Sequence, residues 1–146
     1  MIISIGSDHG GFDYKTKLIQ DLEKEGYTLI DCGTDSKESC NYATFALKAA
    51  LKVEHHEADL AILICSSGEG VSMAANKVKH VRCAILYNDE VAHLAKEHND
   101  ANAIAFGAKF MSYEDVLKRV RIFLNSKFEG GRHIERVKTF DEFEEK

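Results

Sequence analysis

The stretch with the most chemical potential is Cys65-Ser66-Ser67-Gly68-Glu69-Gly70, which follows a short apolar run. Residues this small let several backbone N–H groups turn toward one point, and a helix that starts there adds partial positive charge. Such a setting favours an ionised thiol and stabilises an oxyanion beside it, and proton abstraction next to a carbonyl requires both. A small buried cysteine beside a tight turn explains the same residues equally well, so this loop alone leaves both interpretations open.

Two further polar stretches lie beside predicted strands. Ser7-Asp8-His9-Gly10-Gly11 follows the first strand, and His98-Asn99-Asp100-Ala101-Asn102 precedes the fifth. Each has titratable groups at a strand end, where we expect the fold to place a ligand. Each is weak evidence alone, because a capped turn or a polar loop after a helix has the same composition.

Arg132 and Arg136 are four residues apart, so on a helix they share one face. Two guanidinium groups on one face suit a phosphate or a carboxylate. A solvated charged turn, with Glu129 and Glu135 as the ion-pair partners, is the competing interpretation.

Other chemistries lack their signatures. The loop after Cys65 has neither Gly-Lys-Ser/Thr nor a three-glycine dinucleotide spacing, so no nucleotide cofactor is expected. His55-His56-Glu57 looks like a metal motif, but adjacent residues do not share a helix face, so we interpret it as a solvated helix end and expect no metal. The spacing of the four cysteines matches no disulfide framework, which predicts reduced thiols in a cytoplasmic enzyme; they are Cys32, Cys40, Cys65 and Cys83.

The bulk composition describes one globular domain. The chain has 146 residues, of which 45% are hydrophobic and 29% charged, with a formal net charge of -5. This acidity argues against nucleic acid or an anionic membrane as a partner. No apolar run reaches the roughly 18 residues of a membrane span, and the apolar start lacks the basic residues and cleavage site of a signal peptide.

Short apolar runs alternate with amphipathic stretches along the chain. We predict strands at residues 2–6, 28–31, 60–64, 83–86 and 104–106, and helices at 12–25, 44–53, 70–77 and 90–97, with a last helix capped by Ser112 that runs through Phe123. Residues 60–64 have no polar alternation, which is typical of a central parallel strand. Five strand–helix units in series predict an α/β fold, a three-layer Rossmann-like sandwich with a five-stranded parallel sheet that binds ligands at the carboxyl ends of its strands.

In order and spacing, these segments resemble the ribose-5-phosphate isomerase B family, which also contains the galactose-6-phosphate isomerase subunits. The resemblance covers nearly the whole chain. It rests on Gly6-Ser7-Asp8-His9-Gly10-Gly11-Phe12, Asp31-Cys32-Gly33-Thr34, Ile64-Cys65-Ser66-Ser67-Gly68-Glu69-Gly70, Ala74-Ala75-Asn76-Lys77, His98-Asn99-Asp100-Ala101-Asn102, Ala105-Phe106-Gly107 and Phe128-Glu129-Gly130-Gly131-Arg132-His133.

The resemblance implies an aldose–ketose isomerase that interconverts ribose 5-phosphate and ribulose 5-phosphate through an enediolate. Cys65 would be the base, His98 would open the sugar ring, and Ser67 with the loop amides would hold the oxyanion. The phosphate would be bound by His9 and the two arginines, and no cofactor or metal is implied. The residues implied for substrate binding are Asp8, His9, Ser66, Gly68, Glu69, Gly70, Asn99, Lys109, Arg132 and Arg136.

The resemblance also implies an assembly, because in the family the site lies between two subunits. We therefore expect a homodimer, or a dimer of dimers, in which His98, Asn99 and Lys109 serve the neighbouring chain's Cys65. The single domain, residues 1–146, would end in a C-terminal segment from about residue 126 to 146 that packs on the partner subunit.

Five positions depart from the family pattern. Ser66 adds a side chain where glycine is usual, and Glu69 puts a carboxylate at the helix start, which we expect to face solvent. Lys109 replaces a usual arginine, and Asn41 replaces a usual aspartate but can still cap the helix predicted at residues 44–53. One branch of the family uses a glutamate base just beyond the loop, but Val71 at that position cannot serve, so the chain resembles the thiol branch.

Two other functions stay open at this point. The same chemistry on a six-carbon sugar phosphate, allose or galactose 6-phosphate, would leave every role unchanged. The unusual Ser66 and Glu69 also fit a non-catalytic sugar-phosphate-binding protein.

Overall fold

Five parallel strands form a single sheet in the computed structural model, which describes residues 1–145. They are β1 (Ile2–Ser7), β2 (Thr28–Asp31), β3 (Leu60–Cys65), β4 (Cys83–Ile85) and β5 (Ala103–Gly107). In the spatial order β2-β1-β3-β5-β4, β2 lies beyond β1 on one side of the sheet, and β4 and β5 lie beyond β3 on the other, with β5 between β3 and β4. The switch point between β1 and β3 is where such sheets bind ligands, and the predicted fold class is confirmed.

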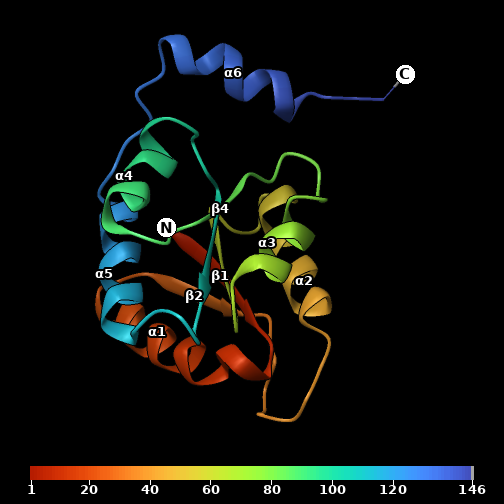
Figure 1. Ribbon diagram of the computed structural model, residues 1–146, viewed down its shortest axis with the longest axis vertical. Coiled ribbons are helices and arrows are strands. Elements are labelled where there is room, and N and C mark those ends of the chain that lie inside the picture. Colours follow the sequence, from red (N-terminus) through yellow and green to blue (C-terminus); the bar gives the residue numbers. More distant parts are fainter. Residues whose placement is uncertain (146) are drawn as a thin grey trace.

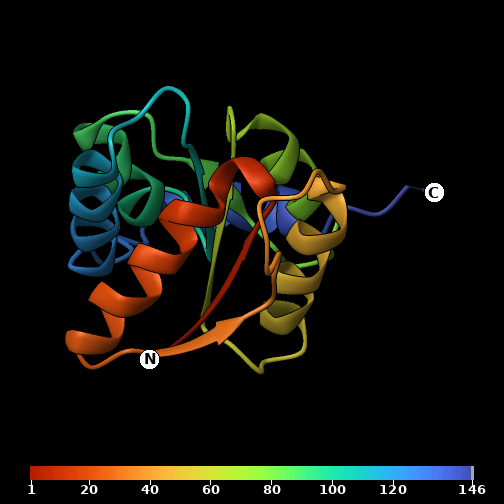
Figure 2. The same cartoon turned by 90° about the horizontal axis from the view of Figure 1, so that it is seen from below.

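Helices cover both faces of this sheet, as Figures 1 and 2 show. One face packs against α1 (Phe12–Lys24), α4 (Asp89–Glu97) and α5 (Tyr113–Leu124), and the other against α2 (Tyr42–Glu54) and α3 (Glu69–Ala75). Alternate side chains of β3 enter the two apolar layers, so every residue of this strand is buried. This burial explains why its sequence lacks polar alternation. No helix of residues 1–145 is long and apolar enough to cross a bilayer.

The predicted boundaries differ from the observed ones by two residues at most. Cys65 is the last residue of β3 rather than the first after it, and α3 ends at Ala75. The predicted caps are present, because Asn41 Oδ1 accepts the Ala43 N–H at 2.9 Å and Ser112 Oγ accepts the Asp115 N–H at 3.2 Å.

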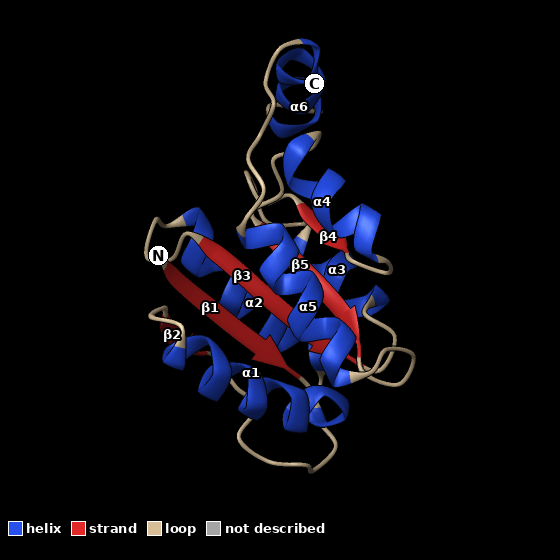
Figure 3. Cartoon of the chain, turned by 90° about the vertical axis from the view of Figure 1, so that its left-hand side faces the viewer, coloured by secondary structure: helices blue, strands red, loops and turns tan. Residues whose placement is uncertain are grey.

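A sixth helix, α6 (Arg132–Asp141), was not among the predicted elements. Figures 1 and 3 show it beyond the sandwich, next to α4, and in Figure 3 the arrowheads of β1, β3 and β5 point away from it. Its only buried residue is His133, although Ile134, Val137 and Phe140 recur every three residues and form a short apolar stripe that could have revealed the helix. Packing of this C-terminal segment on a partner stays a prediction, and Lys146 lies outside the described residues.

An ion pair between a buried lysine and a half-exposed aspartate attaches α1 to the end of β2. Lys15, 2% exposed, donates from Nζ to both carboxylate oxygens of Asp31, at 2.9 and 2.8 Å. Asp31 Oδ1 also accepts the Gly33 N–H at 2.9 Å. The pair therefore fixes the chain where it leaves the carboxyl end of β2, beside the switch point.

We expect Asp31→Asn to lower the free energy of unfolding by about 2–3 kcal/mol, because the variant leaves a buried ammonium group without its counter-charge. Lys15→Met removes the charge and keeps the apolar volume, so it should cost about 1 kcal/mol or less. Urea unfolding of both variants measures the difference. Equal losses would show that the buried charge itself does not matter.

Candidate active site

The thiol of Cys65 lies at the carboxyl end of β3, beside Gly107 of β5. Cys65 is 5% exposed, and the Gly68 N–H donates to its Sγ at 3.2 Å. Gly68 has φ +83°, and a Cβ there would lie 2.9 Å from the backbone carbonyl carbon of Phe106. Glycine is therefore required at this position for two reasons, the positive φ and the close approach of Phe106. The Gly68 N–H points at the sulfur, where it stabilises negative charge.

The rest of the loop is exposed at the edge of the sheet. Ser67 Oγ accepts the Glu69 N–H at 3.2 Å, which leaves the Ser67 O–H available as a donor. Glu69 begins α3 and is exposed, as predicted. The Lys109 N–H donates to the Ser66 carbonyl oxygen at 3.0 Å, so Lys109 belongs to the Cys65 loop of its own chain. The expectation that grouped Lys109 with His98 is therefore wrong, because Lys109 follows β5 whereas His98 precedes it.

The turn after β1 lies against this loop. Asp8 is buried, and its Oδ1 accepts the N–H groups of Gly10 and Gly11 at 2.9 and 3.2 Å. A Cβ on Gly10 would lie 2.7 Å from Ser66 Oγ, so the missing side chain at Gly10 makes room for the unusual serine. His9 is exposed, and its Nδ1 accepts the Cys40 N–H at 3.3 Å.

These contacts bring together a set that we call the carboxyl-edge group: Asp8, His9, Cys65, Ser66, Ser67, Gly68, Glu69, Gly70 and Lys109.

The other predicted site residues lie at the opposite edge of the sheet. The loop from His98 leads into β5, and Asn102 accepts the N–H of Ala61 near the start of β3 at 3.1 Å. Five residues of β5 separate this loop from the Cys65 side, which at about 3.3 Å per residue is about 16 Å. The expectation that the His98 stretch lies at a ligand-binding strand end within one chain is wrong, because a loop that precedes a parallel strand lies at its amino end.

At this amino edge, the ring of His98 stacks on that of His133 with centroids 4.3 Å apart and planes 15° apart. Glu129 Oε2 lies 3.3 Å from His133 Nε2 and 3.9 Å from His98 Nε2. Sequence reasoning gave His133 no role and considered Glu129 only as an ion-pair partner of the arginines, although their spacing of four residues was a possible signal. With Asn99, Arg132 and Arg136, these residues form what we call the amino-edge group.

Arg132 and Arg136 are exposed on the first turns of α6, so they do share a helix. Arg136 Nη1 donates to the Arg132 carbonyl oxygen at 3.0 Å. Among residues 1–145 neither guanidinium forms an ion pair, and Glu129 lies beside the histidines instead. The structure therefore does not support the charged turn that Glu129 and Glu135 were expected to complete.

In residues 1–145, His98, Glu129 and His133 are the one cluster that offers three possible metal ligands. Their arrangement does not fit an ion as it stands, because nearly parallel rings hold their in-plane lone pairs side by side rather than converging. Arg132 and Arg136 on the same helix add positive charge. His55 and His56 are exposed at the end of α2, as predicted.

All four cysteines, each within the described residues, are free thiols, as predicted. Burial of the sulfur raises the pKa of Cys83 to about 12, partly offset by a hydrogen bond from Ser72. Burial also raises the pKa of Cys32. Both shifts favour the protonated thiol at neutral pH.

The family model described as Ribose/Galactose Isomerase matches residues 3–140. Ribose-5-phosphate isomerase B of Escherichia coli is 38% identical over 144 residues, 99% of this chain and 97% of that protein. The solved structure of ribose-5-phosphate isomerase B from Clostridium thermocellum has a TM-score of 0.96 and 44% identity, and covers 97% of this chain and 96% of that chain. The Mycoplasma genitalium ribose-5-phosphate isomerase B, solved with bound ribulose-5-phosphate, has a TM-score of 0.92 and 37% identity, over 96% and 93% of the two chains.

The contact between Gly10 and Ser66 predicts a rescue experiment. Gly10→Ala should clash with Ser66 Oγ and lower the melting temperature by about 3–8 °C, with faster alkylation of Cys65 as the loop shifts. Ser66→Gly in the same chain should restore both values. Calorimetry and mass-spectrometric alkylation rates measure them, and a double variant no better than Gly10→Ala would contradict the contact.

Proposed function

Because this chain belongs to the ribose/galactose isomerase family, we propose that it interconverts ribose 5-phosphate and ribulose 5-phosphate, with Cys65 as the base. The observation that carries this proposal is the thiol held under the Gly68 N–H at the carboxyl end of β3. We place the enzyme in the cytoplasm, since a thiol base must stay reduced.

In the proposed reaction, the Cys65 thiolate removes the proton on C2 of the open-chain aldose phosphate. The electrons of that C–H bond pass into an enediolate across C1 and C2, the proton of the C2 hydroxyl moves to the C1 oxygen, and the thiol then returns its own proton to C1 to give the ketose. The Gly68 and Glu69 N–H groups are already bound to Cys65 Sγ and Ser67 Oγ. The Ser67 O–H and the remaining loop amides are therefore the donors left for the oxyanion.

The second half of the site comes from another copy of the chain. His98 opens the sugar ring, Asn99 helps the partner's Asp8 bind the sugar hydroxyls, and Arg132 and Arg136 bind the phosphate together with His9. Since about 16 Å of strand separates the two edges, the amino-edge group of one chain completes the carboxyl-edge group of its partner. A two-fold homodimer repeats this exchange and holds two sites. Ile134 and Phe140, each about half exposed on α6, offer apolar surface for the contact.

Cys65→Ala tests the base directly. We expect kcat to fall by about 100- to 10,000-fold, the usual contribution of a general base. Cys40→Ala is the matched control, because it removes another thiol near the site and should stay near the wild-type rate. A coupled assay of ribulose 5-phosphate formation measures both, and near wild-type turnover by Cys65→Ala would reject the assignment.

A panel of sugar phosphates tests the substrate. We expect kcat/KM to be highest for ribose 5-phosphate among ribose 5-phosphate, allose 6-phosphate and galactose 6-phosphate. A preference for a hexose phosphate would overturn the choice of substrate and leave the chemistry in place. Tight binding of ribose 5-phosphate without turnover at any pH would point instead to a non-catalytic binding protein.

A further inference from the structure

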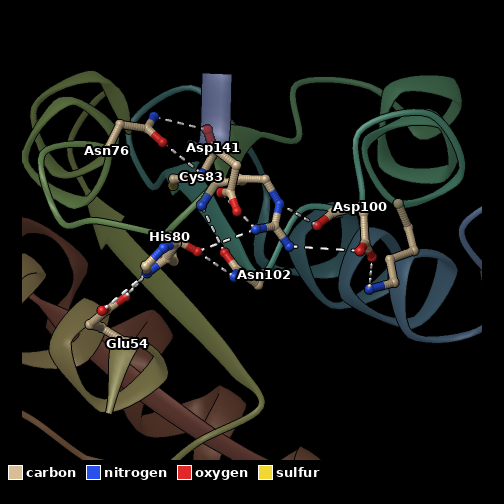
Figure 4. Close-up of polar contacts among 9 residues, drawn as sticks. Glu54, Asn76, His80, Cys83, Asp100, Asn102 and Asp141 are labelled. Atoms are coloured by element: carbon tan, nitrogen blue, oxygen red, sulfur yellow. Dashed lines mark hydrogen bonds and ion pairs between the residues drawn. The ribbon is translucent and has the colours of Figure 1, made fainter. Parts of the chain in front are cut away.

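Arg82, just before β4, joins three segments at the amino edge of the sheet. Its Nη1 donates to Asp141 Oδ1 of α6 at 2.9 Å, and its Nε donates to the Asp100 carbonyl oxygen at 3.0 Å. Nη1 also lies 3.3 Å from the His80 carbonyl oxygen, and the Arg82 N–H donates to Asn102 Oδ1 at 2.7 Å. Figure 4 shows Asp100, Asn102 and Asp141 gathered around this point. The Arg82 side chain is 16% exposed, so these contacts are partly shielded from water.

Helix α6 is fastened to its own sandwich at both ends. In its first turn, His133 stacks on His98, and in its last turn Asp141 pairs with Arg82. His133 is the only residue that the helix buries, so these two contacts rather than an apolar face set its position. Both contacts connect α6 to the loop at residues 98–102, because Arg82 also donates to the Asp100 carbonyl oxygen and pairs with the Asp100 carboxylate.

We propose that Arg82 is a positioning residue, which holds the two arginines of α6 at a fixed distance from His98. The inference rests on the proposed function, since phosphate binding and ring opening must act on the same molecule. A planar guanidinium can donate to Asp141 and to the Asp100 carbonyl at once, whereas an ammonium group on a flexible stem cannot reproduce this fork. Arg82 touches neither the sugar nor the reacting atoms in this role.

Asp141→Asn tests the role, because it weakens the attachment of α6 and leaves the contact between Arg82 and Asp100. We expect KM for ribose 5-phosphate to rise about tenfold, the effect of losing a charged hydrogen bond, with kcat within about twofold of wild type. Arg82→Lys should raise KM similarly. Asp141→Glu, which keeps the carboxylate, should leave KM near the wild-type value. Glu144→Gln is the matched control: its partner Lys79 lies 3.0 Å away on the exposed surface, so KM should not change.

A double variant separates positioning from mere stability. The Arg132→Ala variant has already lost one of the two arginines that α6 must position against the phosphate. In this background, Asp141→Asn should therefore raise KM by less than about twofold. A full tenfold effect in that background, or a lowered melting temperature with unchanged KM, would overturn the role of Arg82. Absence of turnover by the wild-type chain would reject the proposed function, and the inference with it. Turnover by the wild type with equal KM in Asp141→Asn and Glu144→Gln would reject the inference alone.

Discussion

All five strands run in the same direction, and this constraint decides which functional groups can meet. Loops that follow a strand gather at one edge of the sheet, and loops that precede a strand gather at the other. Cys65 ends a strand and Asp8 follows one, whereas His98 precedes one. One chain therefore carries the two groups of candidate residues about a strand length apart, and in the proposed function two chains make one whole site. The position of α6 beyond the amino edge agrees with this division, since it carries Arg132 and Arg136 outward.

The two half-sites are held by different means. At the carboxyl edge, backbone groups and close approaches fix the loop: Gly68 fits only as glycine, and Gly10 leaves space for Ser66. At the amino edge, side chains hold the group together, through the stacked rings of His98 and His133 and the contacts of Arg82. In the proposed reaction both arrangements would hold the reacting groups in place, as a proton transfer that tolerates little change in distance requires.

Local patterns were sufficient to predict the fold. The apolar run at residues 60–64 showed a central strand, and Asn41 and Ser112 marked the starts of two helices. Helix α6 was missed because its apolar stripe, Ile134, Val137 and Phe140, is short and follows Gly130-Gly131, which is typical of a turn. The Cys65 loop and the pair of arginines stood out from residue type and spacing, whereas the roles assigned to them came from the family resemblance. The edge to which His98 belongs follows from strand direction, and that rule was available from the sequence.

Contacts between distant segments could not be predicted from the sequence. Nothing local pairs Gly10 with Ser66, or Arg82 with Asp141, because these contacts exist only after the sheet has formed. Glu129 and His133 are separated by Gly130-Gly131, which reads as a turn, so their shared position beside His98 was hidden as well.

Subunit mixing tests the central claim, that each site combines the carboxyl edge of one chain with the amino edge of another. Cys65→Ala and His98→Asn chains, each inactive alone, would be unfolded together and refolded. Half of the resulting dimers should be mixed, and each should contain one site with both Cys65 and His98 intact, which predicts about a quarter of wild-type activity. Mixed dimers without activity would contradict the account, since a site contained within one chain gains nothing from a partner.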